Sequence, residues 1–243
     1  MSENNPAPEL QVTNPLQAAS EIFYKPRGVF DALAIKDNWS WIAFAIIAVV
    51  MFLPPVFYFS LVDFEWWKNA TFATAMEDMA PAEIDALMAQ TQLGLTKWST
   101  AIGTVIGMVV WFLIVAFYFS LVTKNDEKSV QGFTDWYGAM WWISMPMVIN
   151  SLVALLIISM QTAGSEIAQS VLSPLSLAYI LNVEMASPWF NLLTSVSLPA
   201  LWSIWLGKIC VQAWTQFSAN KCLLISAIPS LIVWSLSLVF III

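Results

Sequence analysis

Polar side chains recur inside two long apolar stretches, and these are the places where the sequence could put chemistry. In residues 136–160, Trp142, Pro146 and Asn150 follow one another at steps of four and therefore share one face of a helix. Pro146 also removes the backbone donor that would pair with the carbonyl of Trp142, and a membrane offers no water to replace it. Residues 189–214 carry a second stripe of polar and small residues, namely Asn191, Ser195, Pro199, Ser203 and Gly207.

We interpret the two stripes as faces that meet and form a polar seam through a helix bundle. Two explanations of such a seam are open. It is either dry packing held by interhelical hydrogen bonds, each worth about 0.6 kcal/mol on average, or a path for a ligand or a lipid headgroup.

The composition excludes most catalytic chemistry. The chain has no histidine, so serine–histidine catalysis and histidine-ligated metals are ruled out. The apolar stretches hold no pair of aspartates, and no glycine-rich phosphate loop follows a strand. We therefore expect no enzyme, no catalytic residue, no metal site and no cofactor. A net charge of −7 also argues against nucleic acid as a partner.

The elements that carry these residues are predicted to be membrane-spanning helices. Of the 243 residues, 59% are hydrophobic and only 10% are charged, whereas a soluble domain has about 25% charged residues. The fold class is therefore all-α, a polytopic membrane protein with five transmembrane helices and short interfacial helices at the N-terminus and in the outer loops. The membrane domain covers residues 41–243, with spans at about 41–62, 98–122, 136–160, 189–214 and 223–243.

Basic residues predict the orientation, because cytosolic flanks collect lysine and arginine. With five spans and a cytosolic N-terminus, only Lys68 and Lys97 lie outside, and the C-terminus is periplasmic. The inner side of this five-span arrangement holds Lys25, Arg27, Lys36, Lys124, Lys128, Lys208 and Lys221. A sixth span at 167–183 would put Lys208 and Lys221 outside and spoil this bias.

The region before the first span is predicted to have two parts. Residues 1–13 form a disordered tail. Residues 14–40 form two short amphipathic helices, of which the first starts with Asn14 as its N-cap and Pro15 at its first position. These helices either lie on the cytosolic leaflet as an interfacial platform or pack against the protein's own spans.

Two further features suggest contacts. Lys208 lies well inside a span and, with Lys221, could hold the phosphate of an anionic lipid, or the two could simply report the positive-inside rule. Ser99, Gly103 and Gly107 follow at steps of four, and such small residues let helices approach closely. The partner helix is expected to be internal, although a second subunit is the alternative, so a homo-oligomer stays open.

The ensemble of these features resembles the Yip family, Rab-GTPase-interacting proteins of Golgi membranes with many bacterial relatives. The matching residues are Asn14-Pro15, Lys25-Pro26-Arg27 with Phe30, Asp135-Trp136-Tyr137-Gly138, Pro146, Trp205 with Gly207, and Ser218 with Lys221. The short N-terminal segment and the long acidic loop at 63–97 depart from eukaryotic members. The chain looks like a bacterial member, to which Rab binding does not carry over, and this places it in the bacterial inner membrane.

The resemblance implies a non-enzymatic membrane protein. Its expected role is to organise membrane lipid or to recruit a protein partner at the cytosolic face. The alternative is a small transporter or lipid-translocating protein that uses the seam between spans three and four.

Overall fold

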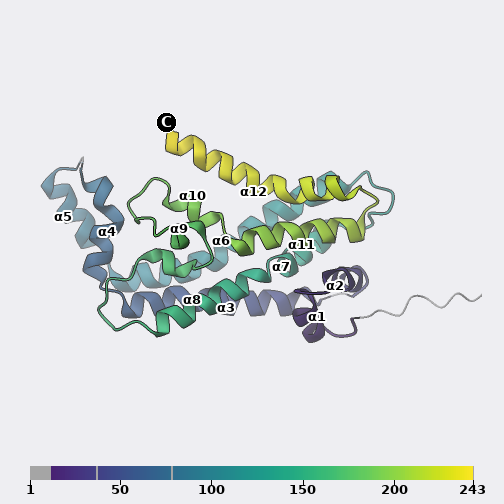
Figure 1. Cartoon of the computed structure of the whole chain (residues 1–243), viewed down its shortest axis with the longest axis horizontal. Coiled ribbons are helices and arrows are strands. Elements are labelled where there is room, and N and C mark those ends of the chain that lie inside the picture. Colours follow the sequence, from purple (N-terminus) through teal and green to yellow (C-terminus); the bar gives the residue numbers. More distant parts are fainter. Residues whose placement is uncertain (1–11, 37, 78, 243) are drawn as a thin grey trace, which may run out of the picture.

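The computed structural model describes residues 12–36, 38–77 and 79–242, and their regular structure is helical apart from two isolated bridges. Figure 1 shows long helices side by side, with α1 and α2 at one end of the bundle and α4 and α5 at the other. The helices are α1 (Pro15–Glu21), α2 (Pro26–Leu33), α3 (Ser40–Leu61), α4 (Phe64–Glu77), α5 (Pro81–Gln90), α6 (Leu93–Thr123), α7 (Phe133–Ile143), α8 (Pro146–Ser159), the 3₁₀ turn η1 (Gln169–Leu172), α9 (Leu177–Ile180), α10 (Phe190–Ser195), α11 (Leu198–Trp214) and α12 (Ala219–Ile242).

Four elements among the described residues are long and apolar enough to cross a membrane: α3, α6, α7 and α8 together, and α12. Their lengths support this, since the 22 residues of α3 reach roughly 33 Å at 1.5 Å per residue, about the thickness of the hydrocarbon core. The predicted fold class, an all-α polytopic membrane protein, is confirmed.

The fourth predicted span, residues 189–214, is not one helix. It is divided into α10 and the 17-residue α11, and α11 alone reaches only about 25 Å. The break lies at residues 196–197, where the Ser197 side chain accepts the backbone N–H of Ala200 and so caps α11. A serine cap followed by proline starts a new helix more readily than it continues an old one.

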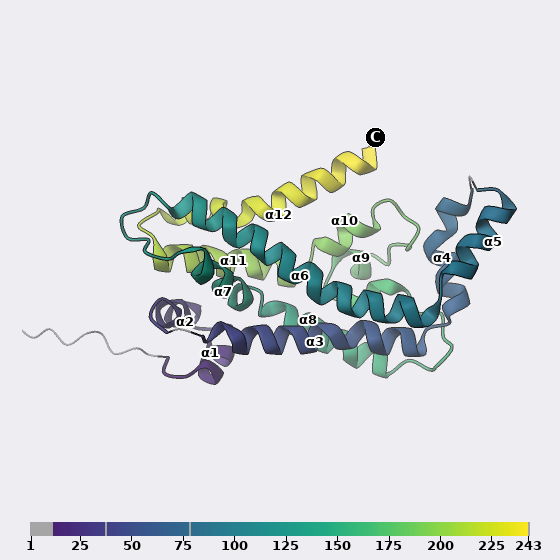
Figure 2. The ribbon, with the colours of Figure 1, turned by 180° about the vertical axis from the view of Figure 1, so that it is seen from behind.

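The backbone groups freed by this break are paired with the segment that precedes α9. The N–H of Leu177 donates to the carbonyl of Val196 at 2.9 Å, and the N–H of Leu198 donates to the carbonyl of Leu175 at 3.0 Å. Figures 1 and 2 show α9 and α10 between the start of α11 and the end of the bundle that carries α4 and α5. Two of the backbone groups at the break are thereby paired within the protein.

The long stretch 133–159 is also interrupted. α7 ends at Ile143 and α8 begins at Pro146, which occupies the first helical position. The carbonyl of Trp142, which the proline would leave unpaired, accepts the N–H of Met145 at 3.2 Å. A tight turn therefore supplies the donor that the sequence predicted to be needed.

The N-terminal region begins as predicted. The side chain of Asn14 accepts the N–H of Gln17 at 2.8 Å, with Pro15 at the first position of α1. Most of the predicted tail 1–13 lies outside the described residues. Of its last two residues, Val12 is buried and Thr13 donates its N–H to the Gln17 side chain.

Gly207, which we counted in the polar and small stripe of residues 189–214, lies where α11 and α12 pack closely. A Cβ atom at Gly207 on α11 would collide with the Oγ of Ser226 on α12, and this hydroxyl donates to the carbonyl of Ile204 at 2.7 Å. The backbones of α11 and α12 therefore approach closely at this point.

We expected Ser99, Gly103 and Gly107 to pack against another helix of this chain, but no described helix lies against them. All three residues are exposed on α6, and a Cβ atom at Gly103 or Gly107 would meet nothing within 4 Å among the described residues. The apolar neighbours of α6 pack on its other side, where Ala101, Phe112 and Ala116 are buried, so the small residues face outward.

Gly207→Val should lower the melting temperature of the detergent-solubilised protein, because the added methyl groups collide with Ser226. Overpacking of this kind costs about 1–3 kcal/mol. Gly103→Val is the matched control, because its side chain enters open space. Equal melting temperatures for the two variants would contradict the close α11–α12 contact.

Candidate interaction site at the end that carries α1 and α2

The polar seam predicted from the sequence is only partly assembled. Asn150 on α8 is 6% exposed. Its Nδ2 donates to the carbonyl of Leu172 at 3.2 Å and its Oδ1 accepts the N–H of Leu175 at 3.3 Å. The amide therefore binds the backbone just after η1, and both its donor and its acceptor are used by structure.

The other seam residues do not converge on Asn150. Asn191 is exposed on α10, and the hydroxyl of Ser195 donates to the carbonyl of Leu192 in its own helix at 2.7 Å. Trp142 and Pro146 are buried. The Trp142 indole nitrogen and the Ser203 hydroxyl are both buried, and neither has a hydrogen-bond partner in the described part of the chain.

The two lysines proposed for a lipid phosphate differ in their surroundings. Lys221 is exposed at the start of α12, with its ammonium 3.3 Å from the centre of the Phe217 ring. Lys208 is half-buried on α11, and it forms no ion pair with any described residue. Both could offer a charge to a headgroup near this end of the bundle.

The short N-terminal helices pack against the bundle rather than lying apart from it. Val29 and Phe30 of α2 are fully buried. The indole N–H of Trp214, the last residue of α11, donates to the carbonyl of Phe30 at 2.9 Å. Tyr24 and Ile35, which flank α2 in the sequence, remain 63% and 67% exposed. The second interpretation of residues 14–40, packing on the protein's own spans, therefore describes α2.

Residues 135–138, which carry part of the family resemblance, organise this end. The carboxylate of Asp135 accepts the N–H of Gly132 at 2.8 Å at the start of α7. Trp136 is fully buried, and its ring lies edge-on to Phe119 at 5.2 Å and to Trp214 at 4.7 Å between centroids.

Gly138 gives the same motif a packing role. A Cβ atom there would lie 2.5 Å from the hydroxyl oxygen of Ser40 at the start of α3. Only glycine lets α7 and α3 approach this closely. The motif therefore sets the spacing of α3, α6, α7 and α11 beneath the N-terminal helices.

The loop at 124–132 is fastened to the end of α11. The carboxylate oxygens of Asp126 both accept the N–H of Gln216 at 3.1 Å, and the ammonium of Lys128 donates to the carbonyl of Ala213 at 2.8 Å. Sequence reasoning missed these contacts, since an acidic and a basic residue in a short loop are ordinary. Figure 1 shows this loop beside the α11–α12 connection.

The fastened loop presents an apolar tip. Val130 is 84% exposed, and Phe133 is 39% exposed with its ring stacked on Tyr137 at 6.4 Å. We name residues 15–36, 124–133 and 215–218 together the N-terminal face. It combines a hydrogen-bonded loop and exposed apolar side chains with three exposed lysines, Lys25, Lys36 and Lys124, which form no ion pair with any described residue.

Two observations concern possible metal or thiol chemistry. No cluster of three or more histidine, cysteine or acidic residues that could hold a metal occurs within the described ranges. Cys210 and Cys222 are both buried free thiols.

Asn150→Leu should destabilise the protein, because the carbonyl of Leu172 and the N–H of Leu175 would lose their buried partners. The expected loss is about 1–3 kcal/mol, measured by thermal unfolding in detergent. Asn191→Leu is the matched control and should leave the melting temperature unchanged. A stable Asn150→Leu protein would contradict a structural role for this amide.

Comparison with known proteins identifies the family. The Yip1 domain model matches residues 20–242, which is nearly the whole chain and includes every membrane-length helix. No curated protein and no solved structure is significantly similar to the chain. This chain belongs to the Yip1 domain family.

Proposed function

We propose that this protein is a non-enzymatic membrane adaptor that recruits a protein partner through its N-terminal face, which lies on the cytosolic side of a bacterial inner membrane. The observation that carries the proposal is the exposed Val130 on a loop that Asp126 and Lys128 hold in place. An apolar side chain that a fixed loop exposes to water gains free energy when a partner buries it.

Rigidity favours binding by this loop. A mobile loop must be ordered when a partner binds, and each immobilised side chain then costs about 0.5–1.5 kcal/mol. The hydrogen bonds to Gln216 and Ala213 order residues 126–128 in advance. The free energy of contact at Val130 and Phe133 is then available for affinity.

Contact with lipid headgroups is the second part of the proposal. Lys25, Lys36 and Lys124 are exposed at this face, and a basic residue near an anionic membrane surface contributes about 1 kcal/mol. Lys208 and Lys221 would add phosphate contacts from α11 and α12. Together these charges would orient the N-terminal face against the inner leaflet, with the C-terminus of α12 on the periplasmic side.

The alternative, a small transporter or lipid-translocating protein, draws its support from the break between α10 and α11. Discontinuous helices mark the binding sites of many transporters. In this chain, however, the backbone groups at the break form hydrogen bonds with Leu175 and Leu177. The side chain of Asn150 forms hydrogen bonds with the same segment. We therefore prefer the adaptor.

A photo-crosslinking amino acid in place of Lys124 should give one adduct of defined protein mass in growing cells. Adding Val130→Asp should reduce its yield about tenfold, the effect of losing about 1.4 kcal/mol of apolar contact. The same probe at the exposed α11 residue Leu201 is the control and should give no such adduct. An adduct that persists in the Val130→Asp variant would overturn the proposed role of the loop tip.

Orientation can be measured separately with single engineered cysteines. The native Cys210 and Cys222 are buried, so a membrane-impermeant maleimide should label the wild-type protein little. We expect Glu83→Cys on α5 to be labelled in cells with a permeable outer membrane and an intact inner membrane. Lys36→Cys should be labelled only after that inner membrane is opened. The reverse pattern would place the N-terminal face outside and exclude a cytosolic partner.

A further inference from the structure

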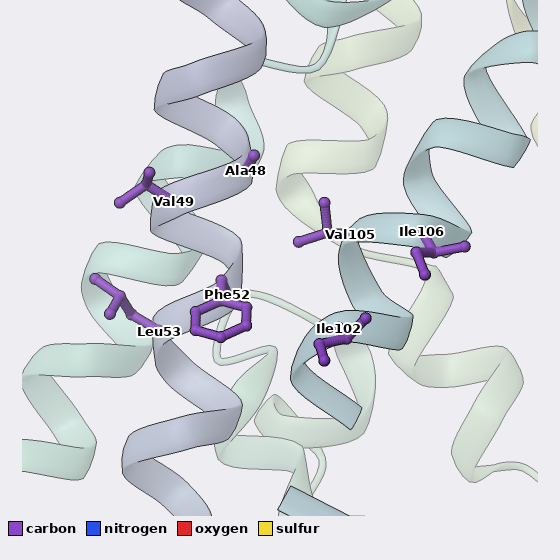
Figure 3. A pocket seen from close by; sticks show the side chains of 7 residues that line it. All are labelled: Ala48, Val49, Phe52, Leu53, Ile102, Val105 and Ile106. Atoms are coloured by element: carbon purple, nitrogen blue, oxygen red, sulfur yellow. The ribbon is translucent and has the colours of Figure 1, made fainter. Parts of the chain in front are cut away.

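A groove runs between α3 and α6 on the outer surface of the bundle, toward the end that carries α4 and α5. It has a volume of about 420 Å³ and its walls are apolar. Figure 3 shows Ala48 and Phe52 of α3 facing Ile102 and Val105 of α6 across it. Both helices are long enough to span a membrane, so the groove opens toward lipid.

One end of this groove carries a positive charge. Phe52, which lines the groove, stacks on Trp98 with 6.2 Å between ring centroids, and the ammonium of Lys97 lies 5.5 Å from the centre of the Trp98 ring. The same ammonium donates to the hydroxyl of Ser60 on α3 at 2.7 Å. A tryptophan and a lysine at the end of a long apolar helix are typical of the headgroup level.

Lys97 forms no ion pair with any residue in the described ranges, whereas Lys68, the other basic residue at this end, is bonded to Glu65 at 2.9 Å. The hydroxyl of Ser60 donates its only hydrogen to the carbonyl of Val56 and accepts one N–H of Lys97. The ammonium of Lys97 has two further N–H donors, which suit a phosphate oxygen.

We propose that the groove holds a zwitterionic glycerophospholipid, with one acyl chain against Ala48, Phe52 and Val105 and its phosphate on Lys97. The apolar groove is complementary to an acyl chain, and the Lys97 ammonium at the headgroup level is complementary to the phosphate. The site is separate from the N-terminal face and does not depend on the proposed adaptor function.

Local charge selects the zwitterionic headgroup. Apart from Lys68 and Lys97, the described charged residues at this end are acidic, and they include Asp63, Glu65, Glu77, Glu83, Asp85 and Glu166. A headgroup with a net negative charge would be repelled by these carboxylates, whereas the ammonium of phosphatidylethanolamine would be attracted to them. The phosphate alone is drawn to Lys97.

Native mass spectrometry of the full chain in a mild detergent would test the site with three dioleoyl lipids: phosphatidylethanolamine, phosphatidylglycerol and diacylglycerol. The wild-type protein should retain phosphatidylethanolamine most tightly. Lys97→Gln should weaken its binding about tenfold, the effect of losing a charge-assisted hydrogen bond. Ala48→Phe should weaken it similarly by filling the groove.

Two matched controls separate the site from general effects. Arg27→Gln removes an exposed basic residue, ion-paired with Asp31, at the other end of the bundle, and Ala45→Phe adds a ring to an exposed α3 position outside the groove. Both should bind as the wild type does, and all four variants should keep the wild-type melting temperature.

Several results would overturn the proposal. Phosphatidylethanolamine bound equally by Lys97→Gln or Ala48→Phe would remove the groove as its site. Diacylglycerol retained as tightly as phosphatidylethanolamine would exclude the phosphate contact. Tighter retention of phosphatidylglycerol would refute the selection of a zwitterionic headgroup.

Discussion

Backbone polar groups inside a membrane must be paired within the protein, and this constraint determines how the bundle accommodates its broken helix. Where α10 stops and α11 starts, the backbone of residues 196–198 is paired with Leu175 and Leu177. The side chain of Asn150 on α8 forms hydrogen bonds with the carbonyl of Leu172 and the N–H of Leu175. An apparently functional asparagine thus serves as a substitute for missing helical hydrogen bonds.

The end of the bundle that carries α1 and α2 is built around aromatic packing. Trp136 joins α6 to α11 through Phe119 and Trp214, and Trp214 extends the connection to α2 through its hydrogen bond to Phe30. The loop at 124–132 is held to the end of α11 through Gln216 and Ala213, so the exposed Val130 lies on a hydrogen-bonded loop. Binding surfaces of this kind need little ordering when a partner arrives.

The two ends of the molecule differ in how they use charge. Near α1 and α2, exposed lysines lie beside anchored loops and suit contact with anionic headgroups. Near α4 and α5, acidic residues dominate, and Lys97 lies at the end of an apolar groove. The contacts with lipid that we propose are therefore chemically distinct, by surface charge at one end and by a shaped site at the other.

Composition and local pattern determined the class of this protein, the long apolar helices, the Asn14 cap and the need of the Trp142 carbonyl for a donor, because each depends on neighbouring residues along the chain. Only the tertiary structure decided which groups meet. The helical step put Asn150 on one face with Trp142 and Pro146, but it could not show that the helix breaks between Ile143 and Pro146 or that the partner of Asn150 is the backbone at Leu172 and Leu175. Likewise, small residues at steps of four have the same spacing whether they face a helix, as Gly207 faces Ser226, or open lipid, as Gly103 does. Periodicity specifies a face, whereas the neighbour of that face depends on how distant segments pack.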